Sequence, residues 1–260
     1  MTTAALTDTQ KLRVPRGPHL GRFKYLSVAR THAGRVRELN EDAYLDRPDI
    51  GLWAVADGMG GHDNGEVAAD LVVEALSRID VFASAPHFRD AALGALQAAN
   101  SALVERALER LSDVMGATVA ALLAYQDHYA CVWAGDSRVY LLRAGQLRRL
   151  TRDHSVVQEM LDAGQLRRDQ MRHHARAHVV TRAVGAADEL KLDVVSGRTY
   201  PGDRFLLCSD GLSNLVEDDE LGDILARPPL QKAVERMIDL ALRRGAPDNV
   251  TAVLVGAEKA

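Results

Sequence analysis

Two hydrophobic patterns alternate along this 260-residue chain and predict where its strands and helices lie. Apolar residues that run continuously or at every second position predict strands, and apolar residues three and four apart predict helices. Predicted strands cover residues 23–29, 43–45, 52–56, 117–125, 129–134, 139–143, 146–150, 192–195, 204–208 and 250–255. Predicted helices cover residues 65–79, 88–111, 217–226 and 230–244.

The order of these elements predicts the fold class. Strands come first, two helices follow, a second group of strands comes next, and two more helices precede the last strand. Each helix pair needs a sheet to cover its apolar stripes, so we expect an α+β fold with two sheets packed face to face and helix pairs outside. Close turns, such as residues 135–138 and 144–145, predict mostly antiparallel pairing.

One domain, residues 23–258, is expected to hold these elements, after a flexible N-terminal tail of residues 1–22. Residues 153–185 carry many Arg and His residues and few apolar ones, so we expect a mobile surface flap. A capping box of Ser155 and Gln158 is expected to open its helix. A solvated loop explains the flap histidines better than a metal site, because no carboxylate or cysteine lies at ligand spacing beside them. These histidines are His173, His174 and His178.

Composition and charge exclude several classes of protein. The chain is 47% hydrophobic and 26% charged, and its net charge of -4 gives no reason to expect nucleic acid or an anionic membrane as a partner. No stretch has the length of a membrane-spanning helix or the pattern of a signal peptide. The two cysteines, Cys131 and Cys208, lie in apolar runs and fit a reducing compartment. We expect a cytoplasmic protein that acts as a monomer.

Four aspartates share one local design at the ends of predicted strands. The strand at 52–56 ends at Asp57 in a glycine-rich stretch, and the same design returns at Asp210. Asp42 and Asp248 each lie just before a strand, and a hairpin would bring Asp42 and Asp57 together. Acidic side chains gathered at one sheet edge repel unless a cation lies among them. Oxygen ligands favour Mg²⁺ or Mn²⁺ over zinc.

A nearby arginine suggests what such a site would act on. Two divalent ions can share one water, lower its pKa and steady the charge on a phosphoryl group. Arg37 lies close to Asp42 in the sequence, and its guanidinium can clamp phosphate oxygens. An exposed salt bridge to Glu38 or Glu41 is the alternative role for Arg37.

Five motifs follow one another in order at fitting separations. They are Arg37-x-x-Asn40-Glu41-Asp42, Asp57-Gly58-Met59-Gly60-Gly61-His62 with Gly65-Glu66, Gly135-Asp136-Ser137-Arg138, Ser209-Asp210-Gly211-Leu212 and Asp248-Asn249-Val250-Thr251. Together they resemble the metal-dependent PPM/PP2C-type protein serine/threonine phosphatases in their short bacterial form. The resemblance covers about residues 23–256. Each motif alone is modest, but five in order are highly specific.

This resemblance implies a four-layer α-β-β-α sandwich with a centre of two Mg²⁺ or Mn²⁺ ions at one edge. Asp57 would bridge both ions, and Gly58 would contribute its carbonyl oxygen. Asp210 and Asp248 would complete one of the ions.

The resemblance also implies roles around this centre. Glu41 and Asp42 would act on the other ion, largely through water, and Arg37 would bind the substrate phosphate. Asp136 would hold a third, weaker ion together with Asp210. The flap would lie beside the active site, where it is thought to influence the choice of substrate.

One position departs from the animal members of the family. They carry a histidine directly after the first Asp-Gly as the proposed general acid, and here that position is Met59. His62 lies three residues further on and is the candidate acid, with packing of the loop as its equal alternative. A metal-bound water is a further candidate for the proton donor.

The function implied is hydrolysis of phosphoserine and phosphothreonine in proteins, in opposition to a bacterial serine/threonine kinase. The pattern is also similar to phosphatases encoded with type VI secretion machinery. A catalytically silent module that holds a phosphorylated partner is the alternative, although the side chains at the ligand positions are acidic. A nucleotide-binding ATPase or kinase would need a glycine-rich loop ending in Gly-Lys-Ser or Gly-Lys-Thr, and the sequence has none.

Overall fold

The structure is a computed structural model that describes residues 21, 23–60, 64–80, 82–109 and 115–260. The predicted tail lies outside these residues apart from Gly21, and so does His62. No helix in the described ranges is both long enough and apolar enough to span a bilayer.

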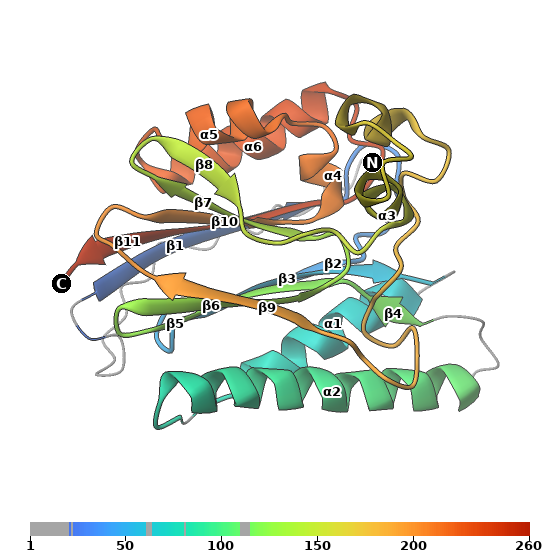
Figure 1. Ribbon diagram of the computed structural model, residues 1–260, viewed down its shortest axis with the longest axis horizontal. Coiled ribbons are helices and arrows are strands. Elements are labelled where there is room, and N and C mark those ends of the chain that lie inside the picture. Colours follow the sequence, from blue (N-terminus) through green and yellow to red (C-terminus); the bar gives the residue numbers. More distant parts are fainter. Residues whose placement is uncertain (1–20, 22, 61–63, 81, 110–114) are drawn as a thin grey trace, which may run out of the picture.

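Two antiparallel sheets form the centre of the molecule and pack face to face (Figure 1). The first sheet has the strand order β1-β11-β10-β7-β8. Its strands are β1 (Phe23–His32), β11 (Val250–Lys259), β10 (Arg204–Cys208), β7 (Arg138–Arg143) and β8 (Gln146–Arg149). The second sheet has the order β2-β3-β5-β6-β9, with β4 paired to β3. Its strands are β2 (Asp42–Arg47), β3 (Leu52–Met59), β4 (Gly116–Ala117), β5 (Val119–Tyr125), β6 (His128–Ala134) and β9 (Asp193–Arg198).

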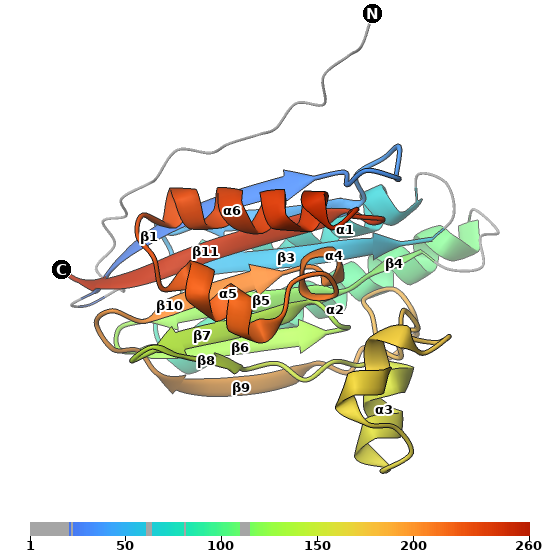
Figure 2. The same cartoon turned by 90° about the horizontal axis from the view of Figure 1, so that it is seen from above.

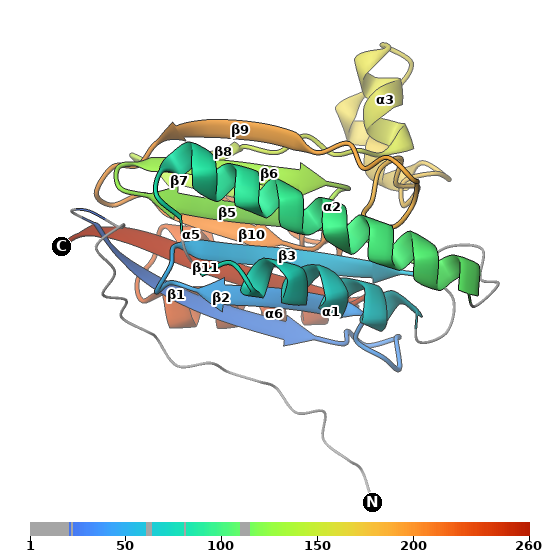
Figure 3. The same ribbon diagram turned by 90° about the horizontal axis from the view of Figure 1, so that it is seen from below.

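Helices cover the outer face of each sheet (Figures 2 and 3). Helices α1 (Asn64–Ser77) and α2 (Ala85–Glu109) cover the second sheet, while α5 (Asp218–Leu225) and α6 (Leu230–Arg243) cover the first. One face of each helix is apolar, so burying it against a sheet removes that face from water. The prediction of an α+β sandwich with two antiparallel sheets and helix pairs outside is confirmed.

Each sheet forms one hydrophobic core with its helices, and a third core lies between the two sheets and holds the largest aromatic side chains. Trp53 from the second sheet and Tyr25 and Phe205 from the first are buried there. The ring centroids of Tyr25 and Trp53 lie 5.4 Å apart across the two sheets. These contacts fix the sheets relative to each other, and therefore also fix the loops that the sheets carry at their ends.

The flap stands beside the sandwich, at the end where α4 (Asp210–Ser213) follows β10 (Figure 2). It holds α3 (Val156–Asp162) and a 3-10 helix, η2 (Arg168–His173). Ser155 caps α3 as predicted, because its side chain accepts a hydrogen bond from the backbone N–H of Gln158. The reciprocal half of the predicted capping box is wrong, because the Gln158 side chain bonds Asp162 and Arg149 instead.

One predicted pairing is wrong. The turn at residues 135–138 does not close a hairpin, because β6 belongs to the second sheet and β7 to the first. Both strands are apolar, and their patterns fit either sheet, so the sequence does not distinguish a hairpin from a crossing between sheets. The crossing places Asp136 at the junction of the two sheets.

Candidate metal centre

The predicted site lies at one end of the sandwich, on the right in Figure 1, where β3 ends and β11 begins. Asp42 and Asp57 are direct partners in the register of β2 and β3, so the expected hairpin does bring them together. Asp210 begins α4 directly after β10, and Asp248 lies just before β11. Side chains far apart in the sequence therefore reach the same end of the molecule.

Asp42 is buried and joins the two sheets. Its Oδ2 accepts hydrogen bonds of 2.8 Å from Ser209 Oγ and 2.7 Å from Thr251 Oγ1. Its Oδ1 is also buried, and no hydrogen-bond donor in the described part of the chain reaches it. A buried carboxylate oxygen without a partner is costly. A cation would satisfy it, so this oxygen fits a metal site.

Burial and the charges of neighbouring carboxylates raise the pKa values of Asp42, Asp57 and Asp136. The pKa of Asp57 lies well above its ordinary value, first because of burial and then because of the charges on Asp42 and Asp210. Burial raises the pKa of Asp42 to about 7. Burial, followed by the charge on Asp210, raises the pKa of Asp136 to about 8. A divalent cation opposes both causes, because it stabilises the ionised carboxylates.

Within the described ranges, no three His, Cys, Asp or Glu side chains are gathered as a ready-made ion site. The charges on Asp42, Asp210, Asp136 and Asp248 nevertheless all act on the pKa of Asp57. Hard divalent cations accept carboxylates, backbone carbonyls and several waters together, so few protein ligands need to converge on one ion. The donor set therefore fits Mg²⁺ or Mn²⁺, and the individual ligand roles remain predictions.

Gly58 lies where the end of β3 meets the start of α1. Its N–H donates a 3.1 Å hydrogen bond to the carbonyl oxygen of Glu41. A Cβ on Gly58 would overlap the carbonyl of Gly65, and a Cβ on Gly65 would overlap the Glu41 carboxylate. The two glycines thus allow a backbone approach that a side chain would block. Burial raises the pKa of Glu41, against the opposing charge of Arg37.

Arg37 forms an ion pair with Asp248 and not with Glu38 or Glu41, so the alternative drawn from the sequence named the wrong partners. Arg37 Nε lies 3.1 Å from Asp248 Oδ1, and Nη2 lies 3.2 Å from Oδ2. The side chains are 53% and 41% exposed, respectively. A guanidinium has five N–H donors, so the Arg37 side chain keeps donors for a further anion.

Three polar residues that support this end of the molecule were not among the predicted site residues. Asn249 Nδ2 donates to the carbonyl oxygens of Ala33 and Leu39, and its Oδ1 accepts from the Glu41 N–H at 2.8 Å. Ser209 and Thr251 are the other two, because their hydroxyl groups donate hydrogen bonds to Asp42. All three lie inside the quoted motifs: Ser209 and Asn249 are directly beside the predicted ligands Asp210 and Asp248, and Thr251 lies three positions after Asp248. That position was the signal available from the sequence.

The flap contributes one further residue that the sequence analysis assigned to a solvated loop. His178 is exposed, and its Nδ1 lies 3.9 Å from Asp210 Oδ2. The nearby Asp210 carboxylate is the main reason that the pKa of His178 is raised. Spacing within the flap could not reveal this contact, because Asp210 lies on a different part of the chain.

Comparisons with known proteins agree with this geometry. The family profile described as Protein phosphatase 2C matches residues 31–255. The serine/threonine protein phosphatase PstP of Mycobacterium tuberculosis is 38% identical over 228 residues, which cover 87% of this chain. PppA, described as a key regulatory component of the T6SS in Pseudomonas aeruginosa, has a structure with a TM-score of 0.84 and 45% identity, covering 90% of this chain and 97% of that one.

A further structure is informative about metals. The catalytic domain of PstP, solved in complex with two manganese ions, has a TM-score of 0.83 and 36% identity. It covers 91% of this chain and 100% of that one. The match to the whole PstP sequence covers 44% of that protein, so the chain spans less than half the length of this curated relative.

Proposed function

Because this chain belongs to the protein phosphatase 2C family, we propose that it hydrolyses phosphoserine and phosphothreonine in proteins. One observation carries the proposal: acidic residues of separate motifs lie at one end of the sandwich, where a buried oxygen of Asp42 receives no hydrogen bond from the described residues. The two manganese ions in the PstP catalytic domain support the same chemistry here.

The proposed ligands divide into three groups. Asp57 would bind both of two ions, and the Gly58 carbonyl would contribute beside it. Asp210 and Asp248 would complete one of these ions, and Glu41 and Asp42 would act on the other. Asp136 would hold a third ion together with Asp210. When bound, Mg²⁺ or Mn²⁺ supplies Lewis-acid activation of water and neutralises charge on the phosphoryl group.

Neighbouring side chains orient the proposed ligand Asp42 and the proposed phosphate-binding residue Arg37. Ser209 and Thr251 hold one oxygen of Asp42, which leaves the other oxygen for an ion. The half-exposed Arg37 guanidinium would bind two phosphate oxygens of the substrate while Asp248 holds it in place. His62 stays a predicted proton donor.

The test is hydrolysis of p-nitrophenyl phosphate by the full chain with Mn²⁺. EDTA should abolish it, and Asp57→Asn should lower kcat/KM by about 100-fold to 1000-fold or more, because charge stabilisation of this kind is worth that much. Asp223→Asn, an exposed aspartate on α5, is the matched control and should leave the rate unchanged. Activity that survives both EDTA and Asp57→Asn would rule the proposal out.

The cellular setting forms part of the same proposal. We propose phosphorylated serine/threonine proteins as substrates, a cognate kinase as the opposing activity, and a monomer acting in the cytoplasm. The unpaired, buried Cys131 and Cys208 support a reducing compartment. The likeness to PppA supports a type VI secretion setting, which dephosphorylation assays with components of that machinery would test.

A further inference from the structure

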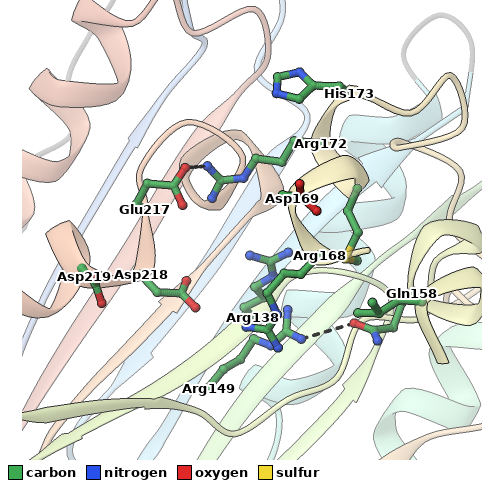
Figure 4. Close-up of a pocket in the computed structure, with 12 residues that line it drawn as sticks. Arg138, Arg149, Gln158, Arg168, Asp169, Arg172, His173, Glu217, Asp218 and Asp219 are labelled. Atoms are coloured by element: carbon green, nitrogen blue, oxygen red, sulfur yellow. Dashed lines mark hydrogen bonds and ion pairs between the residues drawn. The ribbon is translucent and has the colours of Figure 1, made fainter. Parts of the chain in front are cut away.

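A cavity of about 760 Å³ lies between the flap and the start of α5 (Figure 4). Four arginines line it, among them Arg138 on β7, Arg149 on β8 and Arg168 on η2. Figure 4 shows these three side chains meeting in the middle of the cavity, while Asp218 and Asp219 lie on the far side. Like charges that meet in this way need anions to balance them.

The anions of the described residues do not balance this arginine cluster. Arg138 and Arg149 share one carboxylate, the almost fully buried Asp153. Arg138 Nη2 lies 2.6 Å from Asp153 Oδ2, and Arg149 Nη1 lies 3.2 Å from the same oxygen. No hydrogen bond or ion pair from a described residue engages the Arg168 guanidinium. The cluster therefore carries more positive than negative charge.

Two of the other carboxylates around the cavity form ion pairs with arginines outside the cluster. Asp169 pairs with Arg167, and Glu217 pairs with Arg172. Asp218 Oδ1 accepts a 3.0 Å hydrogen bond from the Tyr140 hydroxyl. Asp218 and Asp219 keep their negative charges, but they lie on the side of α5, away from the arginine cluster, so the positive charge predominates on the flap side of the cavity.

This cavity adjoins the metal centre. A smaller cavity of about 30 Å³ is lined by Asp136 and Asp210 from that centre, and it shares Arg138, Met171 and Arg172 with the larger one. The arginine cluster therefore lies beside the proposed metal centre, on the flap side.

We propose that the arginine cluster binds a second anionic group, a phosphate or a carboxylate, on the same polypeptide whose phosphoresidue is hydrolysed. The proposal rests on the phosphatase function proposed above and names its substrate class: phosphoproteins with a second negative charge near the target residue. Arg168 would bind that second charge directly, because its guanidinium is exposed and forms no ion pair with a described residue. Arg138 and Arg149 supply the surrounding positive potential.

The test compares three phosphothreonine peptides that differ at one position, which carries phosphoserine, glutamate or serine, in a series of spacings. Arg168→Gln in the Mn²⁺-loaded full chain should lower kcat/KM about fivefold to tenfold for the doubly charged peptides, through KM. It should leave the serine peptide and p-nitrophenyl phosphate unchanged. The phosphoserine and glutamate arms show which anion the cluster accepts.

Arg176→Gln is the matched control, because Arg176 is also an exposed flap arginine but does not line the cavity. It should affect none of the substrates. Equal kinetics of Arg168→Gln and the wild type on all three peptides would overturn the proposal, and so would equal losses in both variants.

A binding measurement separates this proposal from the phosphatase proposal. Fluorescence anisotropy would follow a labelled peptide that carries only the second anionic group and no target phosphate. Binding that weakens in Arg168→Gln and not in Arg176→Gln supports the cluster even if the chain hydrolyses nothing. Binding that is the same in all three proteins contradicts it.

Discussion

Asp42 shows how single atoms shape the proposed metal centre. Its two oxygens differ: Oδ2 accepts two hydrogen bonds, and Oδ1 is buried without a donor from the described residues. Hydroxyl groups that fix one oxygen of a carboxylate orient the other, and such supporting residues tune the affinity of metal sites. Ser209 and Thr251 therefore belong to the site although neither is a predicted ligand.

We predict that Thr251→Val weakens Mn²⁺ binding by about 10-fold to 100-fold, because it removes one of the two donors that orient Asp42. Isothermal titration with Mn²⁺ measures this directly. Ser101→Ala, which removes an exposed hydroxyl on α2, is the control and should bind Mn²⁺ as the wild type does. Unchanged affinity in Thr251→Val would mean that Ser209 alone orients Asp42.

Sequence reasoning worked at residue scale where the motif itself carried the information. It expected Asp42 and Asp57 to meet, and they are register partners. It could not find the partner of Arg37, because Asp248 lies 211 positions away and comes near only through the pairing of β1 with β11. Spacing in the sequence indicates which residues are close along the chain, whereas this site joins residues that are distant in the sequence and close in space.

At the scale of elements, the contact between β3 and α1 depends on glycine. We predict that Gly58→Ala destabilises the protein by more than about 2 kcal/mol, because its Cβ would overlap the backbone of Gly65 and of Glu41. Urea unfolding measures the loss. Gly94→Ala in α2 is the matched control: its Cβ meets no atom within 4 Å, so it should stabilise the protein by about 0.5 to 1 kcal/mol. Similar effects of the two changes would contradict this account.

The base of the flap depends on a buried histidine. His154 Nδ1 accepts a 3.1 Å hydrogen bond from the Gly135 N–H, so Nε2 carries the proton that faces Asp193. The ring stacks on Trp133, and Arg182 lies beside Nε2. Burial is the main reason that the pKa of His154 lies below 6.5, and Asp193 opposes it.

This arrangement predicts a pH dependence of stability. Because the folded pKa is lowered, the unfolded chain binds more protons than the folded chain below about pH 6.5, and stability falls as the pH drops through this window. The slope of the unfolding midpoint against pH should be smaller in His154→Asn, whose side-chain oxygen can still accept from Gly135. Thermal unfolding between about pH 5 and pH 7 measures it. Equal slopes would show that His154 does not titrate on unfolding.

The positions of elements were predicted better than their partners. The hydrophobic period located the strands at residues 129–134 and 139–143, and both are present with small changes at their ends. The period does not say which sheet a strand joins, because an apolar strand fits the space between the sheets from either side. The wrong hairpin at residues 135–138 follows from that limit.

For the whole molecule, the core between the sheets determines whether the separated motifs meet. Phe205 on β10 packs edge-on against Tyr129 on β6, with ring centroids 5.2 Å apart and planes at 65°. Asp210 follows β10, and Asp136 follows β6. The aromatic contact therefore helps to hold together the two strands that lead to these carboxylates.

We predict that Phe205→Ala destabilises the protein by about 3 to 5 kcal/mol, because it removes a buried ring and leaves a cavity between the sheets. Urea unfolding followed by both fluorescence and circular dichroism should still show one transition, since both sheets share this core. Leu108→Ala, at a residue that is 72% exposed, is the control and should change stability by less than about 0.5 kcal/mol. Two separate transitions in Phe205→Ala would instead mean that each sheet is stable with its own helix pair. In that case the metal centre, which needs both sheets, would lose Mn²⁺ affinity before the protein loses its secondary structure.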